Sequence, residues 1–199
     1  YGTGEEWNKR KKNRYLLYSF KDWMVGAELN FKYNRWIKEL VFEYIYSKYQ
    51  SGPVYHDHSK NVTNHVGGND DFYNHYIYSG WQHWGQVIGN PLYLSPIYNE
   101  IDAIYVYNNR FMGFHLGVSG YPTDRLQYRA LVTWQDGLGT YAEPYTKRKY
   151  NTSFLIESNY QFNHGWNAKL GYAMDFGKIR GNNYGFQLTV SKSGILKFK

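Results

Sequence analysis

Apolar and polar residues alternate along most of the chain, which is the pattern of a β-strand with one apolar face and one polar face. The run 112–119 is typical, because Met, Phe, Leu and Val occupy its even positions while Gly, His, Gly and Ser occupy its odd positions. The same alternation predicts strands at 14–20, 23–31, 39–47, 104–107, 112–119, 126–135, 153–162, 166–176 and 184–191. About eight or nine strands are therefore expected, and the sequence indicates an all-β, antiparallel fold.

Two architectures fit strands of this kind. The predicted strands are about 9–12 residues long, which is the length that crosses a bilayer at a tilt, whereas soluble strands average about 5–6 residues. In a membrane barrel the apolar face meets lipid and the polar face lines the lumen, while in a soluble sandwich the apolar face meets a second sheet. The polar face carries the charged residues Glu43, Arg129, Glu157, Lys169 and Asp175. Rings near strand ends favour the barrel, because aromatic girdles mark membrane interfaces; these rings are Trp23, Trp134, Trp166, Phe176 and Tyr184.

The connections between the predicted strands alternate in length. Short turns are expected at 121–124 and 163–165, a long connection at 136–150 and a medium one at 177–183. In outer-membrane barrels the short turns face the periplasm and the long loops face outside, which places the C-terminal end of the chain in the periplasm. The strand count and the abrupt start indicate part of a larger barrel. We therefore expect residues 1–199 to form a single portion of an antiparallel transmembrane β-barrel.

Composition narrows the classes of function. The 199 residues are 21% aromatic and include 23 Tyr. No apolar run approaches the roughly 20 residues of a transmembrane helix, which excludes a helical membrane protein. The absence of cysteine excludes a disulfide framework and a thiolate zinc site. The net charge is +7, with basic clusters at 9–12 and 147–149; without a nucleic-acid motif we interpret them as solvated turns or as a surface facing anionic glycans and lipids.

The stretch 67–96 differs from the rest, because Tyr and Trp crowd beside Asn, Asp, Gln and His without a regular period. It predicts an ordered loop, part of a long loop at about 51–98. Aromatic rings pack on the C–H faces of sugars, and amides and carboxylates pair with sugar hydroxyls, so this loop is a candidate glycan surface. Its candidate glycan-binding residues are Asn69, Asp70, Asn74, His75, Tyr76, Trp81, His83 and Trp84. The alternative is a plug, whose rings pack inside the barrel and whose amides bond to backbone groups.

A second candidate glycan surface is the connection 137–150, because a basic external loop attracts acidic sugars. Its candidate residues are Tyr141, Lys147 and Arg148. The alternative is a loop that is merely solvated.

A metal site has little support in the sequence. His56, His58 and His65 lie in one loop beside Asp57 but lack a clear fourth ligand. We therefore expect no metal and no cofactor.

Catalysis by paired carboxylates is the remaining chemical possibility. The adjacent acids at 70–71, or Glu43 with Glu157 across a lumen, resemble the acid pairs of glycoside hydrolases. Acids of a barrel lumen usually pair with cations, here Arg129 or Lys169. No nucleophile elbow, phosphate loop or nucleotide motif is present in the sequence. We therefore expect no enzyme activity and assign no catalytic residue.

Short motifs follow one another in a fixed order between residues 39 and 194. They are EY at 43–44, YQSGP at 49–53, GGND at 67–70, YNHY at 73–76, SGW at 79–81, GQVIGNPL at 85–92, SPIYN at 95–99, NR at 109–110, FHLG at 114–117, GTY at 139–141 and DFG at 175–177. In this order they resemble the Wzi family of capsule-assembly proteins, in its Bacteroidetes form.

The resemblance implies an outer-membrane barrel of about 18 strands, of which this chain is the C-terminal portion. It also implies a lectin that attaches or organises capsular polysaccharide at the surface of a bacterial cell. The implied partners are capsular or surface polysaccharide, outer-membrane lipid, lipopolysaccharide and partner proteins in the outer membrane, with no nucleic acid. Two alternatives stay open: a passive barrel, as a pore or scaffold subunit of an outer-membrane complex, and a membrane-embedded glycan hydrolase.

Overall fold

The structure, a computed structural model, describes residues 21–51, 54–55, 66–67, 71–74, 81–99 and 103–194. The chain divides into two compact units. Unit 1 consists of Tyr1–Trp23, Ile45–Met112 and Gly137–Arg148, and unit 2 consists of Met24–Tyr44, Gly113–Asp136 and Lys149–Lys199. Among the described residues, no helix has the length and apolarity needed to cross a membrane.

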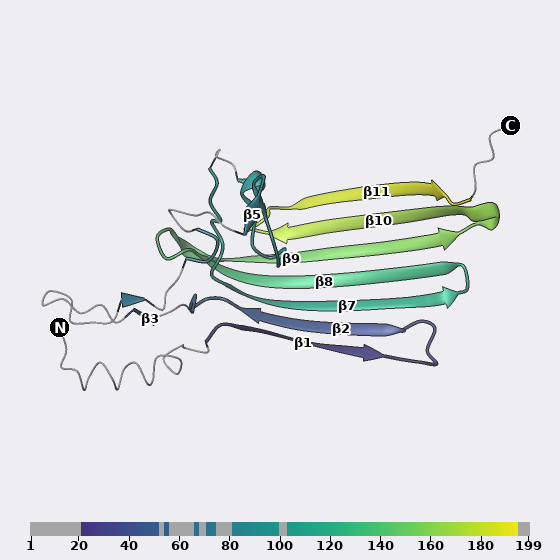
Figure 1. The fold of residues 1–199 in the computed structure, drawn as a ribbon, viewed down its shortest axis with the longest axis horizontal. Coiled ribbons are helices and arrows are strands. Elements are labelled where there is room, and N and C mark those ends of the chain that lie inside the picture. Colours follow the sequence, from purple (N-terminus) through teal and green to yellow (C-terminus); the bar gives the residue numbers. More distant parts are fainter. Residues whose placement is uncertain are drawn as a thin grey trace, which may run out of the picture. The chain divides into compact units, whose positions relative to one another are not determined.

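Seven strands form one antiparallel sheet in the order β1-β2-β7-β8-β9-β10-β11 (Figure 1). They are β1 (Trp23–Asn30), β2 (Glu39–Tyr46), β7 (Phe111–Thr123), β8 (Leu126–Gly139), β9 (Pro144–Gln161), β10 (Trp166–Gly177) and β11 (Asn183–Lys192). Each of the seven overlaps a strand predicted from the alternation of apolar and polar residues, although β7, β8 and β9 are longer than predicted, so the all-β, antiparallel prediction is confirmed. In the described part of the chain the sheet is open, with β1 and β11 as its edges.

The remaining elements are short. They are the strand pairs β3 (Val54–Tyr55) with β4 (Val66–Gly67) and β5 (Gln82–His83) with β6 (Gln86–Val87), and the 3₁₀ turns η1 (Pro96–Tyr98) and η2 (Asn163–Gly165). The turn η2 falls where a short turn was predicted, at 163–165.

The long connection predicted at 136–150 is wrong. β8 continues to Gly139 and β9 begins at Pro144, so only residues 140–143 join the two strands. The alternation disappears at the start of β9 because most side chains of 144–149 are exposed on both faces. Neither face there has to be apolar, so the sequence carries no strand signal.

The turn predicted at 121–124 contains fewer residues than expected. β7 runs to Thr123, and only Asp124 and Arg125 form the turn to β8. The Thr123 hydroxyl oxygen accepts hydrogen bonds from the backbone N–H of Arg125 at 3.4 Å and of Leu126 at 3.1 Å. A side chain therefore closes the turn.

The strand predicted at 104–107 is not formed, and these residues have no regular secondary structure. The physical reason is visible at Val106, whose N–H donates to the side-chain oxygen of Asn74 at 2.8 Å and not to a neighbouring strand. The predicted strand at 14–20 lies outside the described residues.

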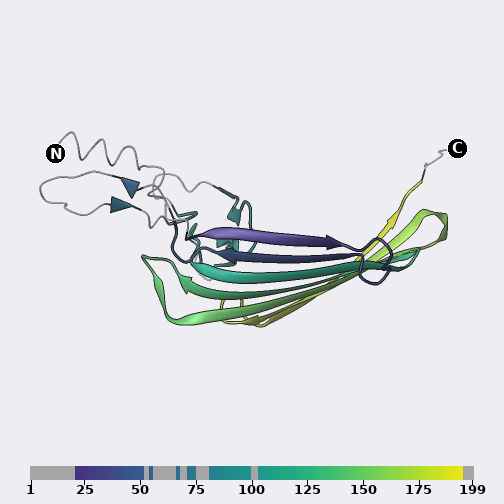
Figure 2. The ribbon, with the colours of Figure 1, turned by 90° about the horizontal axis from the view of Figure 1, so that it is seen from below.

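Within unit 2 the register of β9, β10 and β11 collects the apolar side chains on one face. Leu170 lies opposite Leu188, and Tyr172 lies between Ile156 and Phe186. The three strands lie side by side in both views (Figures 1 and 2). These side chains are uncovered, and Phe186 is 80% exposed while Leu188 is 62% exposed. The alternation in the sequence thus produces a continuous and exposed apolar face.

The other face of the same strands is polar. Lys169 lies opposite Asn159 and Thr189. The Glu157 carboxylate accepts a hydrogen bond from Arg129 Nε at 2.8 Å, and its second oxygen lies 2.8 Å from Lys169 Nζ. The expected pairing of a polar-face acid with Arg129 or Lys169 is confirmed, and both cations take part.

Unit 1 has a small apolar core in which Tyr93, Val106 and Phe111 are buried. The Tyr93 ring lies 4.8 Å from the Phe111 ring and 4.5 Å from the Tyr73 ring. Burial raises the pKa of the Tyr93 phenol to about 12, so the neutral form is the one that packs here.

Buried polar side chains surround this core and bond to the backbone. Gln50 donates through Nε2 to the carbonyl oxygens of Ser47 at 2.8 Å and Asn109 at 2.7 Å, and its Oε1 accepts from the N–H of Phe72 at 2.6 Å. Asn109 donates through Nδ2 to the Phe72 carbonyl at 2.9 Å. Amides therefore hold the described turn 71–74 in an ordered conformation, because buried backbone groups need partners.

Candidate functional site

Among the described residues of the predicted glycan surface, Trp81 and Trp84 are the most exposed aromatic side chains, and they lie directly before and within the hairpin of β5 and β6 in unit 1. Gln82 pairs with Val87 and His83 pairs with Gln86, which leaves Trp84 and Gly85 as the two residues of the turn. Both have positive φ, 49° for Trp84 and 71° for Gly85. A two-residue hairpin turn of this kind favours Asn-Gly, because both central residues need positive φ.

Tryptophan is therefore an unfavourable residue at position 84. A residue with a Cβ in the left-handed region costs about 1–2 kcal/mol. Trp81, just before the hairpin, has a φ of 62° and carries the same kind of strain. Strained residues persist only where the surrounding structure holds them, and they concentrate at functional sites.

Several hydrogen bonds hold the hairpin. The N–H of Ile88 donates to the Trp81 carbonyl at 2.6 Å, and the N–H of Ile97 donates to the Gly85 carbonyl at 2.9 Å. Gln82 donates through Nε2 to the carbonyl of Tyr73 at 2.8 Å. The hairpin is thus fixed both within itself and to neighbouring segments of unit 1.

The two indole rings project from this fixed backbone into solvent. Trp81 is 72% exposed and Trp84 is 86% exposed. The exposed His83 ring lies edge-on to the Trp84 ring, with 6.2 Å between centroids. A sugar ring has the flat C–H face that an exposed indole accommodates.

Asn74 is occupied by protein partners. Its Nδ2 donates to the Asp71 carboxylate at 3.1 Å and to the Val106 carbonyl at 3.0 Å, while its oxygen accepts from the Val106 N–H. The Asp71 carboxylate also accepts from Asn109 and, at 3.2 Å, from the Tyr105 hydroxyl. Both side chains therefore fasten the turn 71–74 to the segment around Val106.

Tyr141, from the second predicted surface, lies against Arg110. The guanidinium carbon is 3.7 Å from the centroid of the ring, which is a cation–π contact. Arg110 Nε also donates to the Lys48 carbonyl at 3.0 Å, and the Tyr141 hydroxyl donates to the Tyr49 carbonyl at 2.9 Å. Burial raises the pKa of the Tyr141 phenol, and the Arg110 charge opposes that rise. Sequence reasoning missed Arg110, because only the fold brings it beside Tyr141.

Lys147 and Arg148 are exposed residues of β9 and do not belong to a long loop. The predicted residues Asn69, Asp70, His75 and Tyr76 lie outside the described residues, as do His56, Asp57, His58 and His65. Within the described ranges, no group of three or more His, Asp or Glu side chains could hold a metal ion.

The structure therefore places His83 and Trp84 on one hairpin that directly follows Trp81, and Tyr141 with Arg110 in a separate cluster. The hairpin presents flat apolar rings beside a hydrogen-bonding imidazole, which is the chemistry that recognises a sugar. Comparisons with protein-family models, with curated proteins and with solved structures found no match to this chain.

Proposed function

We propose that this chain is part of an outer-membrane β-barrel of the Wzi type, which attaches surface polysaccharide through the hairpin of Trp81 and Trp84. The observation that carries the proposal is the presence of two exposed indole rings on strained but well-bonded backbone. Tryptophan at such positions stabilises neither the turn nor a core. A role in binding explains why the rings are there.

The exposed apolar face of β9, β10 and β11 supports the membrane part of the proposal. In outer-membrane barrels the lipid-facing positions of each strand are apolar and the alternate positions are polar. The register that joins Leu170 to Leu188 and Lys169 to Thr189 has this arrangement. A large apolar surface on a soluble monomer would be unusual.

The glycan-binding proposal is tested by capsule retention in cells that express the full-length protein, comparing wild type with Trp81→Ala/Trp84→Ala. We expect the double variant to release polysaccharide, measured in the culture supernatant, while heat-modifiable gel mobility shows an intact barrel. Cells that lack the protein give the reference value for complete loss of capsule retention. Full retention by the double variant, with the barrel intact, would reject the hairpin as the site.

A passive pore or scaffold is the second candidate function, and the cluster of Arg129, Glu157 and Lys169 favours it. Charged side chains on the polar face of a barrel line the route that ions take. A pore produces stepwise ion conductance in planar bilayers, which substitution of the two tryptophans would leave unchanged.

A further inference from the structure

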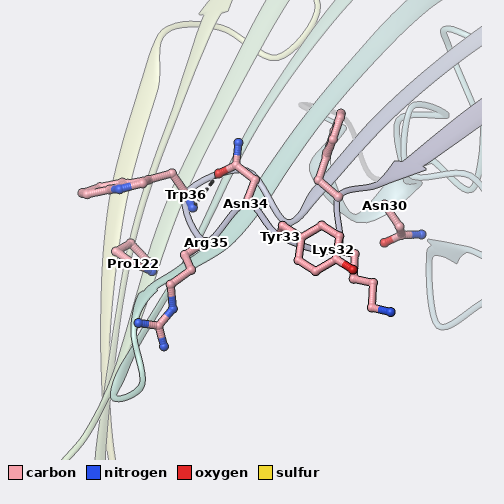
Figure 3. A pocket seen from close by; sticks show the side chains of 8 residues that line it. Asn30, Lys32, Tyr33, Asn34, Arg35, Trp36 and Pro122 are labelled. Atoms are coloured by element: carbon pink, nitrogen blue, oxygen red, sulfur yellow. Dashed lines mark hydrogen bonds between the residues drawn. The ribbon is translucent and has the colours of Figure 1, made fainter.

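We propose that the turn between β1 and β2, residues 31–38 in unit 2, binds the phosphodiester headgroup of an anionic phospholipid. Residues 31–36 of this turn, with Asn30 and Pro122, line a pocket of about 720 Å³ (Figure 3). The inference rests on the membrane placement in the proposed function, but it does not depend on glycan binding.

The turn 31–38 is well ordered. The Asn34 side-chain oxygen accepts from the N–H of Trp36 and of the following residue, each at 3.0 Å. The N–H of Tyr121 donates to the Arg35 carbonyl at 2.8 Å, and the Tyr128 hydroxyl donates to the Trp36 carbonyl at 2.5 Å. The turn is therefore fastened to β7 and β8 by its backbone.

Gly120 permits this close approach. A Cβ at position 120 would lie 2.0 Å from the Trp36 carbonyl oxygen, a distance that no side chain can occupy. The backbone so fixed presents Tyr33, which is 90% exposed, and Trp36, which is 67% exposed. Tyr and Trp rings on ordered turns at strand ends favour the boundary between lipid headgroups and acyl chains.

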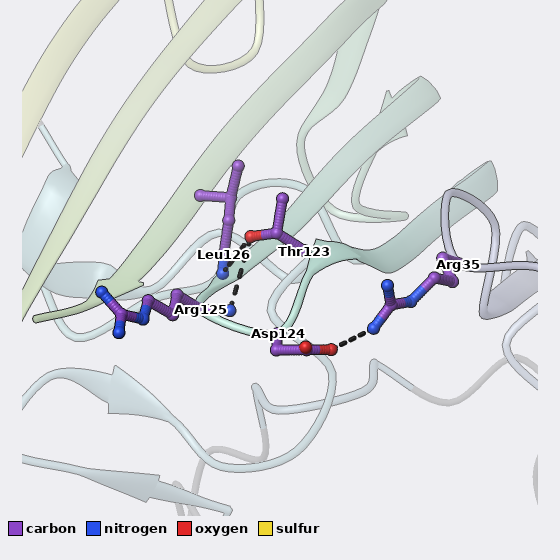
Figure 4. A network of polar contacts seen from close by, with 5 residues as sticks. All are labelled: Arg35, Thr123, Asp124, Arg125 and Leu126. Carbon is purple, nitrogen blue, oxygen red and sulfur yellow. Dashed lines mark hydrogen bonds and ion pairs between the residues drawn. The ribbon is translucent and has the colours of Figure 1, made fainter.

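Two cations accompany these rings in the pocket lining. Arg35 pairs with Asp124, which orients the guanidinium beside the turn of β7 and β8 (Figure 4). A guanidinium has five N–H donors, so one carboxylate oxygen occupies only part of the set. Lys32 Nζ lies 5.6 Å from the Tyr33 ring. Arg and Lys together are the side chains that bind phosphate oxygens.

The neighbouring turns of unit 2 have a similar composition. The Arg125 carbonyl accepts from the N–H of Gln161 at 2.8 Å, and Phe162 donates to the Trp166 carbonyl at 2.8 Å. Lys192 Nζ lies 5.1 Å from the Trp166 ring. Rings and cations therefore continue from the turn of β7 and β8 to that of β9 and β10. An anionic lipid surface matches this combination, because it attracts basic side chains while the rings anchor at the interface.

The test is lipid retention by the full-length protein in detergent, measured by native mass spectrometry after addition of phosphatidylglycerol or phosphatidylcholine. We expect wild type to retain phosphatidylglycerol at least several-fold better than phosphatidylcholine. Lys32→Ala should reduce this preference about fivefold, the effect of one basic side chain near an anionic lipid surface. Lys32→Ala/Arg35→Ala should abolish it.

Lys178→Ala is the matched control, because it removes one positive charge from an exposed residue outside the turn 31–38. It should leave the lipid preference unchanged. Equal retention of the two lipids by wild type would overturn the proposal, and so would an equal loss in Lys178→Ala and Lys32→Ala. Displacement of the bound phosphatidylglycerol by an acidic polysaccharide would also overturn it, since the pocket would then be a glycan site.

The lipid-binding proposal and the glycan-binding proposal can be rejected independently of each other. Trp81→Ala/Trp84→Ala should retain the preference for phosphatidylglycerol, because both residues belong to unit 1 and not to the turn 31–38. Loss of capsule retention in that variant, with lipid preference intact, supports both proposals separately.

Discussion

Trp84 occupies a backbone position that suits asparagine or glycine. Its φ of 49° places it in the left-handed region, beside Gly85 at 71°. Asparagine tolerates this region because its short side chain bonds to the local backbone. The exposed indole therefore weakens the hairpin. A contribution other than local stability accounts for tryptophan at this position.

Trp84→Asn separates the ring from the turn. We expect the variant to keep the hairpin, and to stabilise it by about 0.5–1 kcal/mol, while capsule retention falls. Thermal unfolding followed by heat-modifiable mobility measures the first effect, and released polysaccharide measures the second. Trp84→Phe is the control that keeps a ring and should retain most binding. Unchanged retention in Trp84→Asn would show that the turn alone matters and not the indole.

At the scale of elements, the strands could be predicted from the sequence wherever one of their faces is apolar. The register of β10 with β11 agrees with this, because it sets Leu170 opposite Leu188, and both are apolar positions within the predicted strands 166–176 and 184–191. The start of β9 did not follow, since Lys147 and Arg148 are exposed and carry no periodic signal.

The candidate site was only partly predictable from the sequence, because its geometry depends on contacts that only the fold creates. Composition pointed to Trp81 and Trp84, but it could not show their positive φ, which depends on the hairpin register. Nor could it show the contact of Arg110 with Tyr141, which are far apart in the chain and are joined by the fold. Asn74 looked like a sugar ligand in the sequence, yet its amide bonds to Val106.

The turn 31–38 offers a test at this scale. Gly120→Ala should push the Trp36 carbonyl away from β7, because the added Cβ would lie 2.0 Å from that oxygen. We expect a loss of about 1–3 kcal/mol in unfolding free energy, as in other cases of overpacking, together with weaker retention of phosphatidylglycerol. Gly185→Ala is the control, because a Cβ there meets no atom within 4 Å. Equal stability of the two variants would mean that the turn does not pack on β7 as described.

At the scale of the whole molecule, the question is what covers the apolar face of unit 2. Phe186, Leu188 and Val190 of β11 are 80%, 62% and 59% exposed, and they alternate with Gln187 and Thr189. Water is a poor solvent for such a face, since the burial of each apolar side chain is favourable by about 1.5–3 kcal/mol of free energy. A lipid bilayer and a second protein layer are the two environments that could satisfy it. In both environments the polar face stays in contact with water, so the neighbours of the apolar face are what distinguishes them.

Single cysteines distinguish these environments, and residues 1–199 contain no cysteine that would compete for the label. A nitroxide label at each position from 186 to 190, in the full-length protein reconstituted in vesicles, reports its collisions with oxygen, which dissolves in lipid, and with a water-soluble nickel complex. We expect oxygen to dominate at Phe186, Leu188 and Val190, and the nickel complex to dominate at Gln187 and Thr189. The period of two follows from the alternation of side chains across a strand. Low accessibility to both reagents at the apolar positions would indicate a protein layer instead, and the membrane placement, with the lipid site that rests on it, would then be withdrawn.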